Sequence, residues 1–159
     1  MKNSFFIFLL SLLVLCGCNE PPTTLSEEGK ATITNEITGI VDNFLSPELT
    51  DKTHIALRAN IDGYIMGSDG VILYENYDDY AEGVKAAFEG IEKFISLKPV
   101  KSFVYVLSED AASCTCEFMG QFLAVTGDTI THNGCWTFVF KELDGEWKVV
   151  QENGTHLHE

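Results

Sequence analysis

The second half of the chain constrains the fold most strongly, because from Pro99 onward it consists of long segments that favour β-structure. These segments, rich in β-branched and aromatic residues, are 100–108, 113–126, 129–141 and 146–153. Gly127-Asp128 and Asp144-Gly145 lie between consecutive segments and are typical of hairpin turns. We therefore predict four long antiparallel strands joined largely by tight turns.

The residues before Pro99 are mainly helical in pattern. Apolar residues recur at helical spacing between Ile33 and Leu45, and again between Tyr77 and Ile95. A shorter helix over 48–59 and two short strands, 64–66 and 71–74, are predicted between these two helices. Three helices followed by four strands predict an α+β domain in which the helices cover one face of an antiparallel sheet.

The N-terminus has the pattern of an export signal. An apolar run follows Lys2 and is too short for the roughly 20 residues that span a bilayer. It ends in Leu15-Cys16-Gly17-Cys18, which resembles the lipobox of bacterial lipoproteins. The resemblance implies a signal peptide over 1–17, a lipid on Cys18, a tether over 18–24 and a membrane-anchored, extracytoplasmic place in the cell envelope. An ordinary signal peptide is the alternative.

Charge and cysteine content exclude several classes of function. With 10 Lys and Arg against 24 Asp and Glu, the net charge of −14 excludes strong general affinity for nucleic acid. If Cys16 is removed and Cys18 is lipidated, the odd number of remaining cysteines cannot form a complete disulfide framework. Cys114 and Cys116 lie two apart on a predicted strand and so point to one face. Their spacing to Cys135 matches no zinc pattern, and we predict buried thiols and neither a metal nor a cofactor.

Two stretches of the chain resemble the NTF2-like superfamily and, within it, the SnoaL-like group. The first runs from Tyr80-Ala81-Glu82-Gly83 to Phe88-Glu89-Gly90-Ile91, and the second from Trp136 to Phe140 and on through Asp144-Gly145-Glu146-Trp147-Lys148-Val149-Val150. The resemblance covers residues 25–157. It implies one domain over 25–159, with a strongly curved antiparallel sheet whose concave face, closed by three helices, forms a conical cavity. It also implies a homodimer that uses the other face of the sheet.

Some members of this superfamily are proton-transfer enzymes, which set a base opposite hydrogen-bond donors. The first predicted helix contains no tyrosine, and the position of the donor acid falls at Trp136. The position of the base falls near Asp69, although 67–70 is more simply a turn. His156 follows the last predicted strand, where a solvated tail residue is the simpler interpretation. Asp69 and His156 therefore remain candidates, and no catalytic residue is assigned.

Residues that alternate along the predicted strands are candidates for lining the cavity. Trp147, Gln151 and Asn153 share one strand face, and Glu117, Met119 and Gln121 share another. Either set would place a few polar groups in an apolar cone, which is typical of a small-molecule site. For the tryptophans, a role as core aromatics is the alternative that we favour. The complete set of candidates is Tyr64, Glu117, Met119, Gln121, Trp136, Phe138, Trp147, Gln151 and Asn153.

These patterns predict a lipid-anchored protein whose domain binds a small apolar or amphipathic molecule. Its predicted partners are that ligand, the membrane through the N-terminal lipid, and a second copy of the chain. An enzyme of the cyclase or isomerase type is one alternative, and it requires an ionisable group with a perturbed pKa in the cavity. A protein-interaction module is the other, and it requires a filled cone and an exposed apolar patch.

Overall fold

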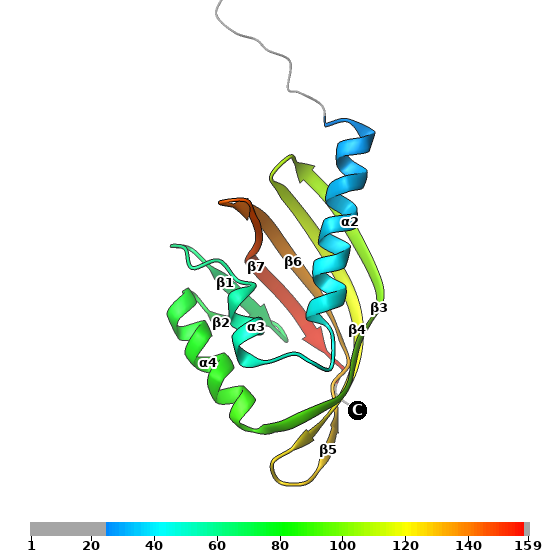
Figure 1. The fold of residues 1–159 in the computed structure, drawn as a ribbon. Helices are drawn as coiled ribbons and strands as arrows, with labels where there is room; N and C mark the ends of the chain where they lie inside the picture. Colours follow the sequence, from blue (N-terminus) through cyan, green and yellow to red (C-terminus); the bar gives the residue numbers. More distant parts are fainter. Residues whose placement is uncertain (1–24, 158–159) are drawn as a thin grey trace, which may run out of the picture.

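The computed structural model describes residues 25–157, which form three helices and seven strands (Figure 1). The helices are α2 (Glu27–Phe44), α3 (Asp51–Ala56) and α4 (Tyr77–Glu89). The strands are β1 (Ile65–Ser68), β2 (Val71–Tyr74), β3 (Ile91–Ser108), β4 (Ala111–Ala124), β5 (Thr129–Thr131), β6 (Gly134–Leu143) and β7 (Glu146–His156). The predicted α+β class is confirmed. The predicted N-terminal export signal, including Cys18, and the predicted tether lie outside the described residues.

The strands form one curved sheet in the order β2-β1-β7-β6-β4-β3, and β5 pairs with β4. The sheet is mixed rather than purely antiparallel, because β1 runs parallel to β7, with Ile65 opposite Gln151. We predicted antiparallel pairing across the turns Gly127-Asp128 and Asp144-Gly145, and the pairs β4–β5 and β6–β7 are antiparallel as predicted. The strands β1 and β7 are far apart in sequence, so no hairpin fixes their relative direction.

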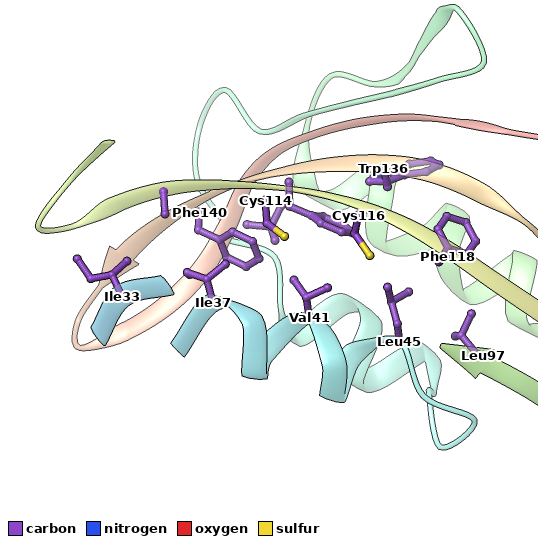
Figure 2. Packing of buried hydrophobic residues seen from close by; sticks show 13 residues of the cluster. Ile33, Ile37, Val41, Leu45, Leu97, Cys114, Cys116, Phe118, Trp136 and Phe140 are labelled. Carbon is purple, nitrogen blue, oxygen red and sulfur yellow. The ribbon is translucent and has the colours of Figure 1, made fainter. Parts of the chain in front are cut away.

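Helix α2 lies along the concave face of the sheet (Figure 1). Ser26 caps its N-terminus by accepting a hydrogen bond from the backbone N–H of Gly29 at 3.0 Å. Its apolar side, which includes Ile37 and Val41, packs against the sheet (Figure 2). Cys114 and Cys116 lie on one face and are buried in this core cluster as unpaired thiols, whereas Cys135 is exposed, so the prediction of buried thiols is wrong for Cys135. The helix is therefore held by its apolar stripe, as expected for an amphipathic helix on a sheet.

Two predicted helices are shorter than their apolar patterns indicated. Helix α4 ends at Glu89, and the strand β3 begins at Ile91, so our prediction of a helix reaching Ile95 was wrong. Gly90 is the C-cap of the helix. The residues after it pair with β4 as a strand whose register shifts at several points. Helix α3 begins only after Thr50, whose side chain forms a capping box with Thr53.

The helices α3 and α4 cover the end of the sheet that α2 leaves open. Helix α4 contacts both α3 and β2. A second core cluster, formed by Tyr64, Tyr80, Ala81 and Val84, fixes α4 in this place. The three helices thus enclose a space against the inner face of the sheet.

Within residues 25–157, no helix combines the length and apolar character needed to cross a membrane.

Candidate functional site

A cavity of about 550 Å³ lies between the helices and the inner face of the sheet. All three helices and all seven strands contribute residues to its wall. Most of the lining is aliphatic or aromatic, and the polar exceptions are few. These exceptions are His54, Arg58, Tyr74, His132, Trp136, Glu152 and His156.

A buried carboxylate in the cavity wall is fully occupied by protein donors. Glu152 is only 2% exposed. Its Oε1 accepts from Arg58 Nε at 2.8 Å and from the Tyr64 hydroxyl at 2.5 Å. Its Oε2 accepts from Arg58 Nη2 at 2.7 Å and from Trp136 Nε1 at 2.9 Å. Arg58 and Glu152 therefore form a bidentate ion pair, and Tyr64 and Trp136 each donate one further hydrogen bond to the carboxylate.

The Glu152 carboxylate stabilises the charged form of Arg58. Burial opposes the positive charge of Arg58, but the adjacent Glu152 carboxylate outweighs burial and raises the pKa of the guanidinium. Burial, followed by the same carboxylate, raises the pKa of Tyr64, so its hydroxyl keeps the proton that it donates. The third guanidinium nitrogen, Arg58 Nη1, donates to the His54 carbonyl at 2.9 Å. The ion pair thus presents no unmatched charge to the cavity.

A histidine from α3 lies beside this cluster. The Tyr80 hydroxyl and His54 Nδ1 are 2.7 Å apart. Burial, followed by the positive charge of Arg58, lowers the pKa of His54, which keeps the imidazole neutral. Burial also raises the pKa of Tyr80, which keeps the phenol protonated. The pair is therefore a neutral phenol against a neutral imidazole.

A second histidine is held by an aspartate from the β1–β2 turn. Asp69 Oδ1 accepts from the His156 backbone N–H at 2.7 Å, and Oδ2 lies 2.9 Å from His156 Nδ1. The hydrogen bonds from the His156 backbone, the His156 ring and Ser68 lower the pKa of Asp69, so it is ionised. An ionised carboxylate can only accept, so His156 Nδ1 carries the proton. In the neutral imidazole, Nε2 is then the acceptor.

A third histidine lies next to His156. The ring centroids of His132 and His156 are 4.7 Å apart. Burial, followed by the electrostatic effect of the adjacent His156 ring, lowers the pKa of His132 to about 4. His132 is therefore neutral at pH 7. It adds a polar but uncharged edge to this end of the cavity.

The rings that line the cavity form a continuous series, which we call the aromatic girdle. Neighbouring ring centroids in the series are between 4.7 and 6.1 Å apart. The ion pair closes the series, because Arg58 lies 4.5 Å over the Phe44 ring and Trp136 donates to Glu152. In order, the girdle is Phe44, His54, Phe88, Phe94, Phe122, His132, His156 and Trp136.

Some of the candidates predicted from sequence lie at this cavity. Trp136 and Phe138 line it, and both also belong to the main core cluster. Tyr64 lies behind the wall and reaches Glu152. Asp69 and His156, which we considered separately, are in direct contact. His156 lies in β7 and not in a tail, because β7 continues to pair with β6 up to Gly134.

The other candidates lie away from the cavity. Glu117, Met119 and Gln121 alternate with the buried side of β4 and are exposed on the opposite face of the sheet. Trp147 is half-buried, and its indole N–H reaches Glu36 at 3.0 Å instead. Gln151 and Asn153 are exposed because the register of β7 shifts beside Val149. That bulge turns Glu152, Gly154 and His156 inward in their place.

Sequence reasoning missed Arg58, Glu152, His54, Tyr80 and His132. One signal was available, because Arg58 is the single arginine of the chain and falls in an apolar context. Such a residue is buried only with a partner. Among residues 25–157, no group of three or more His, Cys, Asp or Glu side chains could hold a metal ion.

Comparison with known proteins finds likeness in structure. No protein-family model and no curated protein matches the sequence. An NTF2-like superfamily protein from Salmonella enterica serovar Typhimurium has a TM-score of 0.68 at 14% identity, over 82% of this chain and 94% of that one. A putative scytalone dehydratase from Novosphingobium aromaticivorans has a TM-score of 0.70 at 11% identity, over 84% and 89%. A hexachlorocyclohexane dehydrochlorinase, LinA type 2, has a TM-score of 0.63 at 13% identity, over 84% and 90%. At these identities the likeness concerns the fold, and this chain has the NTF2-like fold.

Proposed function

We propose that this protein binds a small, mostly apolar molecule in the cavity between its helices and its sheet. The observation that carries the proposal is the cavity itself, about 550 Å³ in volume and lined mainly by apolar and aromatic side chains. Binding sites for small molecules have this size and this make-up, with a few placed polar groups. An open cavity also favours a binding protein over an interaction module, which requires a filled cone.

A neutral apolar dye tests this proposal. N-phenyl-1-naphthylamine fluoresces when it enters an apolar site, and we expect saturable binding of one dye per chain. Ala86 and Ala87 on α4 are both exposed, but only Ala87 lines the cavity. The variant Ala87→Trp should weaken dye binding, and the matched control Ala86→Trp should not. Equal binding by both variants, or no saturable binding by the wild type, would contradict the proposal.

A proton-transfer enzyme is a second candidate, and the contact between Asp69 and His156 favours it. An imidazole oriented by a carboxylate, with its free nitrogen at a cavity, is the arrangement of a general base. The names of two similar structures, a scytalone dehydratase and a dehydrochlorinase, suggest elimination reactions to try. In a dehydrochlorination, the base takes a proton from carbon, a C=C bond forms and chloride leaves. Chloride release from hexachlorocyclohexane that is lost in His156→Gln would support this candidate, and no release by the wild type would count against it.

We also propose that the domain is attached to the cell envelope through a lipid on Cys18. The support is the sequence Leu15-Cys16-Gly17-Cys18 at the end of an apolar run. In a bacterial host, Cys18→Ser should move the protein from the membrane fraction to the soluble fraction and remove the lipid mass. The neighbouring Cys16→Ser is the matched control and should leave both unchanged. A membrane-bound Cys18→Ser protein would refute the anchor.

The outer face of the sheet supports a homodimer. Phe103 and Tyr105 on β3 are 61% and 70% exposed, and Met119 on β4 is 48% exposed. Exposed aromatic and apolar side chains on one sheet face are typical of a contact surface. Sedimentation equilibrium should give a dimer for the wild type and a monomer for Phe103→Asp. A monomeric wild type would overturn this proposal.

A further inference from the structure

The tautomer of His54 is fixed by its hydrogen bond to Tyr80. The phenolic hydrogen of Tyr80 has two acceptors within reach: His54 Nδ1 at 2.7 Å and the His54 carbonyl at 3.5 Å. The carbonyl already accepts from Arg58 at 2.9 Å, so the nitrogen is the better acceptor. Because the imidazole is neutral and its Nδ1 accepts, its single proton is on Nε2. His54 therefore offers an N–H donor.

His156 has the opposite tautomer. Its Nδ1 proton is committed to the Asp69 carboxylate, so Nε2 carries a lone pair. A neutral His156 therefore offers an acceptor. The backbone N–H of His156 and the hydroxyl of Ser68 also donate to Asp69, which keeps the carboxylate in place behind the ring. The cavity thus has two imidazoles with complementary roles.

Both Nε2 atoms are open to the cavity. Neither has a hydrogen-bond partner among residues 25–157, and no buried side-chain nitrogen or oxygen of these residues lacks one. The Nε2 atoms are therefore accessible, and both residues line the cavity. The two imidazoles lie apart: the ring neighbours of His54 are Phe44, Tyr80 and Phe88, and those of His156 are Phe118, His132 and Trp136.

The rest of the wall favours an uncharged and flat molecule. The ion pair in the lining, between Arg58 and Glu152, is internally neutral, and both side chains are 1% exposed. An ionised ligand would therefore lose its hydration without gaining a counter-charge. The aromatic girdle offers ring faces and edges, which suit an aromatic body in offset or edge-on contact.

We propose that the cavity selects an uncharged, flat aromatic molecule that carries a hydrogen-bond acceptor, such as a ketone, at the His54 end and a hydroxyl at the His156 end. This inference rests on the proposed small-molecule function and names the ligand class for it. Along β7, four residues of extended strand, about 13 Å of backbone, separate His156 from Glu152, whose partner Arg58 also donates to the His54 carbonyl. The two polar groups of the ligand therefore belong at opposite ends of a body of at least two fused rings.

A set of matched naphthalenes tests the proposal in the full-length protein. The chain has two tryptophans, and Trp147 is away from the cavity. In a Trp147→Phe background, Trp136 in the cavity wall is the sole reporter, and its fluorescence follows binding directly. The probes are 6-hydroxy-2-acetonaphthone, 2-acetonaphthone, 2-naphthol and the anion 6-hydroxy-2-naphthoate. We expect the hydroxy ketone to bind about three- to tenfold more tightly than either singly substituted probe, and the anion to bind most weakly.

Two variants test which imidazole recognises which group. Tyr80→Phe releases the His54 tautomer, so it should abolish the preference for the ketone and keep the preference for the hydroxyl. Asp69→Asn allows an amide N–H to donate to His156 Nδ1, which turns Nε2 into a donor and should abolish the preference for the hydroxyl. Tyr77→Phe and Asp78→Asn are matched controls outside the cavity lining and should keep both preferences. Ratios of affinities are compared within one variant, so a general loss of stability does not imitate either result.

The outcomes separate this inference from the function on which it rests. The inference is supported if the hydroxy ketone binds most tightly, Tyr80→Phe loses only the preference for the ketone and Asp69→Asn loses only the preference for the hydroxyl. Binding of all four probes with equal affinity overturns the donor and acceptor assignment and leaves a small-molecule site. Tightest binding of the anion overturns the assignment as well. If no probe changes the Trp136 fluorescence, both the inference and the proposed function fail.

Discussion

Removing the charge of Glu152 should strongly destabilise the protein. In Glu152→Gln the side chain keeps its shape, but Arg58 becomes a buried cation without a counter-charge, and an amide N–H faces donors. The Arg58 and Glu152 side chains are each 1% exposed, and four hydrogen bonds converge on the carboxylate. Breaking a buried pair of this kind from one side costs about 3–5 kcal/mol. Against the roughly 5–15 kcal/mol that holds a domain together, this is a large share.

Urea unfolding followed by circular dichroism measures the effect. The unfolding midpoint should fall while the dependence on urea stays unchanged, since the same surface is exposed. Glu117→Gln removes an exposed carboxylate on β4 and should change the free energy of unfolding by no more than about 0.5 kcal/mol. The double variant Arg58→Met/Glu152→Met should recover part of the loss, because no charge is then buried alone. A Glu152→Gln protein within about 1 kcal/mol of the wild type would refute this reasoning.

Three further changes have definite expected outcomes. Gly154→Ala should lower the free energy of unfolding by about 1–3 kcal/mol, because its Cβ would lie 2.3 Å from Trp136 Cε3. Urea unfolding measures this loss, and a variant as stable as the wild type would contradict the packing of Trp136 on Gly154. Gly39→Ala in α2 should raise it by about 0.5–1 kcal/mol, since nothing lies within 4 Å of the new Cβ, and a thermal midpoint below that of the wild type would count against this. The pKa of His132 is lowered from 6.5 to about 4, so the unfolded chain takes up a proton in that range before the folded one, and stability should fall as the pH falls from 6.5 to 4. Urea midpoints across this range should fall less steeply in His132→Gln, and equal slopes would contradict the burial of a neutral imidazole.

Sequence periodicity predicted the elements whose packing is local and regular. The stripe containing Ile37 and Val41 placed α2 correctly, and the Asp144-Gly145 turn placed the β6–β7 hairpin. The end of α4 was missed because Ile91 and Ile95 continue a helical spacing by chance, while Gly90 ends the helix. Helical spacing alone therefore extends the helix over Ile91 and Ile95, because it takes no account of the residue that ends the helix.

The site was harder to predict because a bulge and distant contacts determine it. The alternation that grouped Gln151 with Trp147 fails where the register of β7 shifts, and Glu152 turns inward instead. The partners of Glu152 and His156 come from residues more than 80 positions away, Tyr64 and Asp69. Such pairs follow from the sheet order, which composition and spacing do not specify.

Native mass spectrometry of the purified protein tests the central claim, that the cavity is a small-molecule site, most directly. The wild type should carry one small molecule per chain, which is lost on denaturation, and Ala87→Trp should carry less of it than Ala86→Trp. Addition of 6-hydroxy-2-acetonaphthone should displace that molecule and appear in its place. Wild-type protein that is bare before and after the addition would contradict the account.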